Sequence, residues 1–258
     1  MPKIRLDQLL VSRGLAESRE QAQRLILAGA VLVGDAPATK PGQPTDAEAE
    51  LRLRQTLRYV SRGGEKLEAA LDGFGIDVEG RVCADVGAST GGFTDALLQR
   101  GAARVYAIDV GYGQLHWKLQ SDPRVIVLDR TNARHLASLP EPVALATVDA
   151  SFISLRQLLP VVRGWLEPGG EIIALVKPQF EVGREQVGKG GVVRDPKLHR
   201  QVIADLLTWA EAEALAPQGV LPSPLLGPKG NREFLLWLRP SKPSSGSPHS
   251  DPKGLEDL

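Results

Sequence analysis

A glycine-rich segment between an apolar run and an amphipathic run constrains the fold of this chain more than any other feature. The apolar run from residue 81 ends at Asp85, the glycine-rich loop follows, and residues 93–98 have the pattern of a helix. Such a strand–loop–helix unit lets the backbone approach a nucleotide-like ligand where a Cβ would collide. A second predicted strand, 104–109, ends in Asp109, which follows Asp85 at about the spacing expected for a carboxylate that binds a ribose. The segment therefore predicts a nucleoside-binding site.

The spacing of the glycines narrows the choice of cofactor. Gly87, Gly91 and Gly92 follow the pattern G-x-x-x-G-G, which does not place the second glycine where a pyrophosphate packs. An acid at the strand end also repels a diphosphate, whereas it suits a cofactor with a positive centre and hydroxyls. The pattern thus favours S-adenosylmethionine over a dinucleotide, and an ordinary glycine-rich turn is the alternative.

Composition limits the remaining possibilities. The 258 residues, 42% of them apolar, allow one α/β domain and a small additional module. No apolar run approaches the ~18 residues that span a bilayer, and the N-terminal residues lack the apolar core of a signal peptide. A single cysteine, Cys83, excludes an internal disulfide, and the four histidines show no ligand spacing. We therefore expect a cytoplasmic protein that has no contact with membranes and no metal site.

The first 35 residues predict two short helices followed by a hairpin. The second helix opens with the capping box Ser18–Gln21 and ends at Gly29, and Gly14 has the position of a C-cap for the first. An apolar stripe with helical spacing marks the first helix, at Ile4, Leu6, Leu9 and Leu10. The pattern then predicts a strand at 31–35, a loop at 40–50 and an exposed strand at 51–54.

Three segments of this region, Arg5–Leu10, Gly14–Arg19 and Val31–Gly34, carry a pattern that resembles the S4 RNA-binding module. The resemblance implies that basic side chains face structured RNA. Although the net charge of the chain is zero, residues 1–62 carry ten Lys/Arg against seven Asp/Glu, which permits a local basic face. We expect RNA contacts from the basic residues of this region, with Arg13, Arg19 and Arg24 on one surface; the candidates are Lys3, Arg5, Arg13, Arg19, Arg24 and Arg62.

Beyond residue 64, apolar strands alternate with helical stretches. Helices are expected at 65–71 and from Asp195-Pro196 to about 214, where the aspartate and proline form a typical helix start. The strands are expected at 81–86, 104–109, 124–128, 143–149, 171–177, 219–224 and 233–239. This alternation predicts an α/β fold with a mostly parallel sheet, and the last two strands, with no helix between them, predict a hairpin at one edge.

Charged residues at strand ends are the candidates for chemistry, because open α/β sheets bind ligands there. Asp149 ends the fourth strand, Lys177 ends the fifth, and Glu233 leads into the last, whereas Lys66 starts the helix before the first strand. A lysine in a desolvated cleft has a lowered pKa and can act as a base for a hydroxyl. For Lys66, a solvated helix position is the alternative.

Two exclusions favour a hydroxyl as the methyl acceptor. Carbon-5 methylation of pyrimidines needs a cysteine nucleophile, and Cys83 lies inside a predicted strand. Exocyclic amine methylation usually shows an Asn/Asp-Pro-Pro-aromatic loop after the fourth strand, whereas this chain has Asp149-Ala-Ser-Phe152.

As a whole, the chain resembles the TlyA family of S4-domain rRNA 2′-O-methyltransferases, often labelled hemolysin A. The matching segments are Tyr59–Leu67, Asp85–Asp95, Asp109–Leu115, Val148–Ile153, Val176–Gly183, Gly188–Arg194 and Gly230–Phe234. The resemblance implies a Rossmann-like class I methyltransferase fold with seven strands, S-adenosylmethionine as cofactor, and a catalytic tetrad at Lys66, Asp149, Lys177 and Glu233. It also implies a cytidine ribose in large-subunit rRNA as the substrate, and in some members small-subunit rRNA as well.

Together these patterns assign the parts of the chain. We expect an S4-like domain at 1–57, a linker at 58–64, a methyltransferase domain at 65–240 and a disordered tail at 241–258. The candidates for cofactor binding are Asp85, Gly87, Ser89, Gly91, Gly92, Phe93, Asp109 and Asp129. The partner is ribosomal RNA in assembled subunits, while the oligomeric state is left open.

Two departures from the family pattern bear on these expectations. The chain enters the S4 pattern almost at once, which favours large-subunit rRNA alone as the substrate, and Tyr59 stands where the linker often has a tryptophan. Residues 183–191 have the glycine density of a mobile loop that closes on RNA, or else form a long connector.

Three other functions fit the sequence less well. A membrane-active hemolysin is opposed by the lack of a long basic amphipathic helix. An RNA-binding assembly factor with an inactive methyltransferase domain is opposed by the complete set of site residues. A methyltransferase for a small metabolite gives no reason for an S4-like module.

Overall fold

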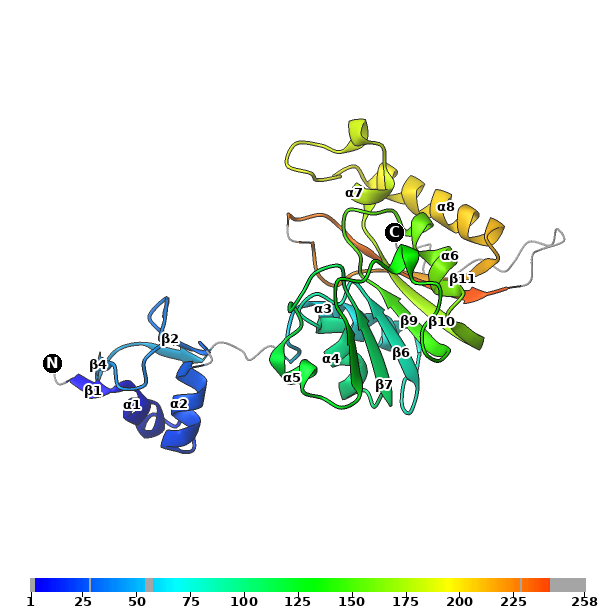
Figure 1. Ribbon diagram of the computed structural model, residues 1–258. Coiled ribbons are helices and arrows are strands. Elements are labelled where there is room, and N and C mark those ends of the chain that lie inside the picture. The colour runs from blue at the N-terminus through cyan, green and yellow to red at the C-terminus, as the bar shows by residue number, and fades with distance from the viewer. Residues whose placement is uncertain (1–2, 28, 54–57, 228, 242–258) are drawn as a thin grey trace. The chain divides into compact units, whose positions relative to one another are not determined.

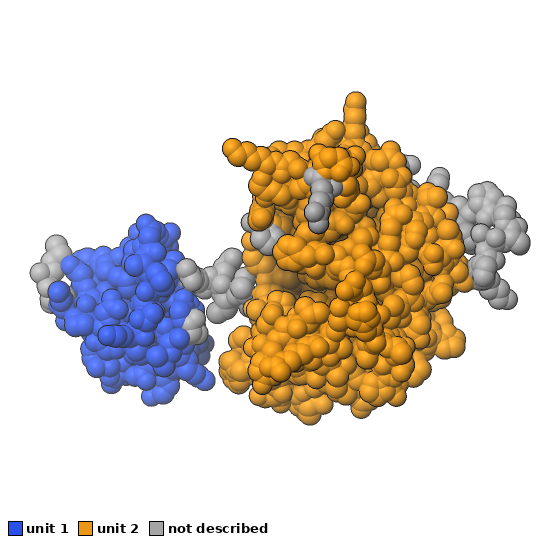
Figure 2. All heavy atoms as spheres, turned by 45° about the horizontal axis from the view of Figure 1, so that its top comes forward, with its two compact units in different colours: residues 1–57 blue, residues 58–258 orange. Residues whose placement is uncertain are grey.

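The computed structural model describes residues 3–27, 29–53, 58–227 and 229–241. The chain forms two compact units, residues 1–57 and residues 58–258 (Figure 2). The last residues of the expected S4-like domain, 54–57, which include the end of the expected strand 51–54, and nearly all of the expected tail lie outside the described residues. Among those that are described, no helix is both long and apolar enough to cross a membrane.

Unit 1 is a small α+β fold with two antiparallel sheets. Its helices are α1 (Leu6–Ser12) and α2 (Arg19–Leu27), and its strands are β1 (Lys3–Arg5), β2 (Val31–Val33), β3 (Ala36–Pro37), β4 (Pro44–Asp46) and β5 (Leu51–Leu53). Strand β1 pairs with β4, and β2 lies between β3 and β5. A core of seven buried apolar residues holds the helices to the strands: Leu6, Leu10, Ala16, Ala22, Ile26, Val31 and Ala38.

Two expectations for this unit were wrong. Ile4 belongs to β1, where it pairs with Thr45, and not to the first helix. The segment expected as a loop, 40–50, contains the partner strand β4. In both cases a strand of only three residues is set by its tertiary partner, which overrides a weak local pattern. Gly14 follows the C-cap Arg13 with a φ of +69°, the left-handed conformation that glycine adopts most easily there.

Unit 2 is built on a seven-stranded sheet with the order β11-β12-β10-β9-β6-β7-β8. The strands are β6 (Val82–Val86), β7 (Arg104–Ile108), β8 (Val125–Leu128), β9 (Val143–Val148), β10 (Leu166–Val176), β11 (Leu215–Pro222) and β12 (Phe234–Pro240). Strands β10, β9, β6, β7 and β8 are parallel, whereas β12 runs antiparallel to both β10 and β11. The expected mostly parallel sheet with a terminal hairpin is confirmed.

Helices cover both faces of this sheet (Figure 1). They are α3 (Gly63–Phe74), α4 (Gly92–Gln99), α5 (Trp117–Gln120), α6 (Leu159–Arg163), α7 (Pro178–Glu181) and α8 (Pro196–Ala212), with short turns η1 (Ala133–His135), η2 (Leu155–Gln157) and η3 (Arg184–Gln186). Residues of α3 and α4 form one apolar core, and residues of α6 and α8 form another. The strand order reverses between β6 and β9, so a crevice is expected beyond their carboxyl ends.

Two strands are longer than the sequence pattern indicates. Strand β10 begins at Leu166, and its pairing with β9 shifts register between Leu166 and Glu171, across Pro168 and two glycines. Strand β11 begins at Leu215 because it pairs along the whole length of β12. These extensions lie at the end of the sheet away from the site.

Candidate active site

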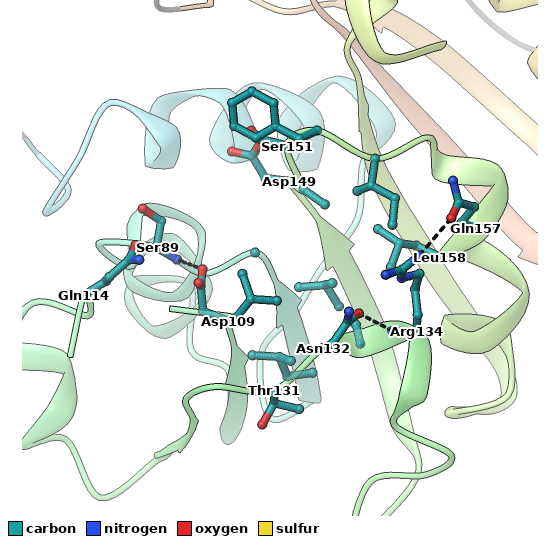
Figure 3. A pocket seen from close by; sticks show the side chains of 18 residues that line it. Ser89, Asp109, Gln114, Thr131, Asn132, Arg134, Asp149, Ser151, Gln157 and Leu158 are labelled. Carbon is teal, nitrogen blue, oxygen red and sulfur yellow. Dashed lines mark hydrogen bonds between the residues drawn. The ribbon is translucent and has the colours of Figure 1, made fainter. Parts of the chain in front are cut away.

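A cavity of about 610 Å³ opens at the carboxyl ends of β6, β7 and β9 (Figure 3). Its volume is within the range of small-molecule and cofactor sites. Its position at the reversal of strand order is where open α/β sheets bind ligands. The lining residues are Val86, Gly87, Ser89, Ile108–Val110, Gln114, Thr131–Arg134, Asp149–Ile153, Gln157 and Leu158.

Gly87 is required by its surroundings at the edge of this cavity. Its φ is +84°, and a Cβ there would lie 2.7 Å from the carbonyl oxygen of Asp149. The backbone of β9 approaches this closely because the N–H of Asp149 donates to the carbonyl of Val86. The first glycine of the loop therefore lets two strand ends meet beside the cavity.

Gly91 and Gly92 have a different role, because they do not line the cavity. A Cβ on Gly92 would collide with the hydroxyl of Ser61, and one on Gly91 would collide with the side chain of Leu119. Phe93, the next residue, is buried in the core beneath α4. Gly92 and Phe93 therefore pack α4 against the residues at the start of α3, and Gly91 packs against α5, while Gly87 and Ser89 line the cavity.

Asp85 lies below the cavity and does not line it. Its carboxylate is fully buried and accepts hydrogen bonds from the backbone N–H of Thr94 (2.9 Å), the hydroxyl of Thr94 (2.7 Å) and the hydroxyl of Thr147 (3.3 Å). Burial raises the pKa of Asp85 to about 7, the bonds from Thr94 oppose the rise, and the charge of Asp149 adds to it. In this arrangement Asp85 joins α4 to β6 and β9, and its contact with a cofactor stays a prediction.

Asp109 faces the cavity from the end of β7. Its Oδ2 accepts from the N–H of Ser89 at 2.8 Å, and its Oδ1 accepts from the N–H of Gly111 at 2.7 Å (Figure 3). Asp129, after β8, accepts from the N–H of Gly113 at 2.9 Å and is not part of the lining. Of the two acids predicted on these strands, only Asp109 borders the cavity.

The opposite wall contains residues that the sequence patterns did not single out. Asn132 accepts from the N–H of Arg134 at 3.1 Å, and the guanidinium of Arg134 donates to Gln157 at 3.1 Å (Figure 3). Gln114 and Thr131 complete the polar lining. These polar residues all come from segments that follow β7, β8 and β9. Their position after strand ends is the sequence signal that could have marked them.

The four charged candidates form two ion pairs. The Nζ of Lys66 lies 2.5 Å from Oε2 of Glu233, and the Nζ of Lys177 lies 2.7 Å from Oδ1 of Asp149. Lys177 also donates to the hydroxyl of Ser151 at 2.9 Å, a partner that sequence reasoning missed. Both lysines are nearly buried, and burial of an ammonium is costly unless it is paired.

Sheet register explains why three of these residues come to one place. Val176 is paired with Phe234, so Lys177 and Glu233 lie opposite each other just beyond the ladder of β10 and β12. Asp149 directly follows β9, the parallel neighbour of β10. Adjacent strands are about 4.8 Å apart, so the three side chains share one edge of the sheet. Lys66 joins them from α3 through its ion pair with Glu233.

Asp149 links the ion pairs to the cavity, because it lines the cavity and pairs with Lys177. Gly227 contributes at the other pair, where a Cβ would collide with the carboxylate of Glu233. The site can therefore hold a small molecule beside a lysine whose charge is compensated by a carboxylate. Among the described residues, no group of three or more His, Cys, Asp or Glu side chains is arranged to hold a metal ion.

The basic candidates of the N-terminal region have different surroundings. Arg5 and Arg19 pair with Asp7, whereas Arg13 donates to the backbone carbonyls of Ala47 and Ala49. Arg13 therefore holds the turn after β4, although its side chain is exposed like those of Arg19 and Arg24, and a common RNA-binding surface of the three stays a prediction. Lys3 and Arg24, and Arg62 before α3 in unit 2, have exposed side chains.

The glycine-rich segment 183–191 is anchored at its far end. Asn231 is buried and accepts from the N–H of Val193 at 2.9 Å, while its amide donates to the carbonyl of Gly191 at 2.9 Å. Gly188 and Val192 form a β-bridge. The segment thus has the contacts of an ordered connector over Gly188–Val193.

Comparison with known proteins identifies both units. The sequence profile of FtsJ-like methyltransferases matches residues 59–240, and that of the S4 domain matches residues 4–51. The 16S/23S rRNA (cytidine-2′-O)-methyltransferase TlyA of Mycobacterium tuberculosis is 49% identical over 99% of this chain and 95% of its own. A Bacillus subtilis protein, YqxC, described as a proposed rRNA methyltransferase, is 51% identical over 92% of this chain and 85% of its own. A solved structure from Streptococcus thermophilus, described as a proposed hemolysin, superposes with a TM-score of 0.71 at 43% identity, covering 98% of this chain and 91% of that one.

Proposed function

The chain belongs to the family of FtsJ-like methyltransferases, as a member of the TlyA type that carries an S4 domain, and from this premise we propose that it 2′-O-methylates a cytidine of ribosomal RNA. The methyl donor is S-adenosylmethionine. The observation that carries the proposal is the pair Lys177–Asp149, in which a nearly buried lysine is held at the wall of the cavity. In the second pair, Lys66–Glu233, the glutamate directly precedes β12, the strand next to β10.

The residues around the cavity fit S-adenosylmethionine. Asp109 presents a carboxylate for ribose hydroxyls, and Gly87 lines the cavity with backbone alone. The carboxylate of Asp149 lies on the same wall and suits a positive centre. When bound there, the cofactor supplies an electrophilic methyl group on a sulfonium.

The protein's part in such a transfer is to align the hydroxyl and to remove its proton. We assign proton removal to Lys177, whose Nζ is held by Asp149 and Ser151 on two sides. Lys66, from α3, and Glu233, directly before β12, would hold the ribose beside Lys177. Unit 1 would bind the RNA mainly through phosphates, which position the substrate without reading its sequence.

The test is transfer of labelled methyl from S-adenosylmethionine to unmodified 30S subunits, 50S subunits and naked rRNA. We expect label in rRNA that maps to a 2′-O-methylcytidine after nuclease digestion and mass spectrometry. Lys177→Met should abolish the label while leaving cofactor affinity by calorimetry unchanged. Lys197→Met, at an exposed lysine near the start of α8, serves as the matched control and should retain activity.

The arms of this experiment separate the remaining possibilities. Label confined to 50S rRNA, or shared with 30S rRNA, identifies which subunit is modified, and label in naked rRNA shows whether assembly is needed. Cofactor binding without label in any RNA would remove rRNA from consideration and favour a small hydroxylated substrate. Retained activity in Lys177→Met would remove this lysine from the reaction.

A further inference from the structure

Asp7 is the most heavily engaged side chain of unit 1. It has no exposed surface, and its two oxygens accept from five N–H groups. Oδ1 accepts from Nε of Arg5 (3.1 Å) and the backbone of Gln8 (3.0 Å). Oδ2 accepts from Nη2 of Arg5 (2.9 Å), Nε of Arg19 (3.0 Å) and the amide of Gln23 (3.0 Å). One buried carboxylate thus joins β1, α1 and α2.

Only a carboxylate can accept all of these bonds. All five partners are donors, and an ionised aspartate is a pure acceptor with two oxygens. An asparagine would present an NH₂ group to some of them. The Arg5 guanidinium, with the bonds from Gln23 and Arg19, holds the pKa of Asp7 below its usual range despite burial, so the group is charged at neutral pH.

The two arginines that share this carboxylate are partly exposed to solvent. Their side chains are half exposed, 46% for Arg5 and 48% for Arg19. Because Nη2 of Arg5 and Nε of Arg19 bind the same oxygen, they lie at most about 6 Å apart. No hydrogen bond within the described residues engages Nη1 of Arg5 or either Nη of Arg19. Gly42 lies next to the Arg5 guanidinium, since a Cβ on Gly42 would lie 3.1 Å from Nη1 of Arg5.

This geometry differs from that of Arg13 and Arg52, two other described arginines of the unit. Arg13 is bound to backbone carbonyls. Arg52 pairs with Asp35, but that carboxylate is fully exposed and has no buried framework behind it. Within the described part of unit 1, two guanidinium groups from different elements meet over one buried anion at Asp7 alone, and its charge also offsets their mutual repulsion.

We propose that Asp7 is a positioning residue that holds Arg5 and Arg19 together as one phosphate-binding site for RNA. The site keeps a net charge of one positive unit and offers planar donors suited to phosphate oxygens. Preorganisation lowers the entropy lost when two long side chains bind one group. The inference rests on the proposed function, and it concerns how unit 1 binds the substrate.

Asp7→Asn tests the inference, because the two explanations predict opposite changes in affinity for RNA. The substitution makes the protein more positive by one charge, which by counterion release alone should strengthen binding to RNA. Positioning predicts the reverse, a loss of about tenfold in affinity for rRNA, because the guanidinium groups lose their common acceptor. Asp35→Asn makes the same charge change at an exposed arginine pair and should leave affinity equal or slightly higher.

A second pair of variants keeps the test independent of folding. Arg19→Lys retains the charge on a half-exposed side chain but removes Nε and the planar fork, so affinity should fall severalfold. Arg52→Lys, the same exchange at a half-exposed arginine that pairs with Asp35 and not with Asp7, should have no effect. The double variant Asp7→Asn/Arg19→Lys should lose little more than Asp7→Asn alone, because both changes remove one interaction.

Affinity is measured by equilibrium titration of 50S subunits and an rRNA fragment at several salt concentrations, with thermal unfolding as a check on folding. The salt slope of Asp7→Asn should fall towards that of Arg19→Gln. Equal or tighter binding by folded Asp7→Asn, or equal losses in the two arginine-to-lysine variants, would overturn the positioning role alone. A wild-type protein that binds no RNA would overturn this inference and the proposed substrate together.

Discussion

The Nζ of Lys66 lies 2.5 Å from Oε2 of Glu233, although 167 residues separate the two along the chain. The pair joins α3, which precedes the first strand of the large sheet, to the residue that leads into the last strand. Both side chains are nearly buried. Folding of unit 2 thus brings Lys66 and Glu233 together as the second ion pair of the site.

Removing one partner of this pair should destabilise unit 2 strongly. Lys66→Met or Glu233→Gln leaves a buried charge or a buried donor without its partner, at a cost of about 3–5 kcal/mol. The double variant Lys66→Met/Glu233→Leu should recover most of that loss and still transfer no methyl. Urea unfolding and methyl transfer, measured on the same preparations, separate the two effects. Unchanged stability in both single variants would show that the pair is not formed in solution.

Ser151→Ala should reduce methyl transfer less than Lys177→Met. Loss of the lysine removes the proposed base, for which a decrease of about 10²–10⁴ in kcat is typical. Loss of the hydroxyl leaves the pair with Asp149 at 2.7 Å, so the Nζ keeps one of its two anchors and kcat should fall about tenfold. Single-turnover kinetics at saturating cofactor give both values. An equal loss in the two variants would contradict the assignment of Lys177 as the base.

Gly87→Ala should abolish cofactor binding. The substitution forces a Cβ against the carbonyl of Asp149 in a backbone conformation with φ of +84°. Gly80→Ala is the matched control, because Gly80 has a φ of +71° but open space around its Cβ position. The control should lose only about 1 kcal/mol of stability, the cost of the backbone conformation, and bind S-adenosylmethionine normally. Calorimetric titration distinguishes them, and normal binding by Gly87→Ala would place the cofactor elsewhere.

Asp85 should make the stability of unit 2 depend on pH. In the unfolded chain its pKa is about 3.9, whereas burial raises it to about 7 in the folded protein. Between these values only the unfolded chain loses the proton, so the free energy of unfolding decreases as the pH rises from 4 to 7. The stabilisation that protonated Asp85 contributes is fully present below about pH 4 and is lost above about pH 7.

Asp85→Asn should remove this dependence, because the amide mimics the protonated acid towards Thr94 and Thr147. At pH 8 the variant should be more stable than the wild type by roughly 1–3 kcal/mol, with a smaller difference at pH 5. Urea unfolding at the two pH values measures the change. A difference between variant and wild type that is the same at both pH values would show that Asp85 is ionised in the folded protein throughout.

Much of the fold could be predicted because the spacing of apolar residues and the residues that start or end an element are local features of the sequence. Alternating strands and helices predicted the parallel sheet, and the long helix begins after Asp195 as expected, where the aspartate caps the N–H of Lys197. The short strands β1 and β4 could not be predicted, because three residues carry too little pattern and their pairing partner decides them. The same holds for the start of β11, which is set by β12.

For the site, the sequence by itself determined which residue types stand at strand ends: Asp109, Asp149, Lys177 and Glu233. Only the tertiary structure decided what each one contacts. It placed Asp85 under the loop, engaged Arg13 with backbone carbonyls, brought Ser151 to Lys177, and joined Arg5 to Arg19 through Asp7. The physical reason is that a strand end fixes an edge of the sheet, whereas burial and hydrogen-bond partners depend on elements that are distant in sequence and meet only when the chain is packed.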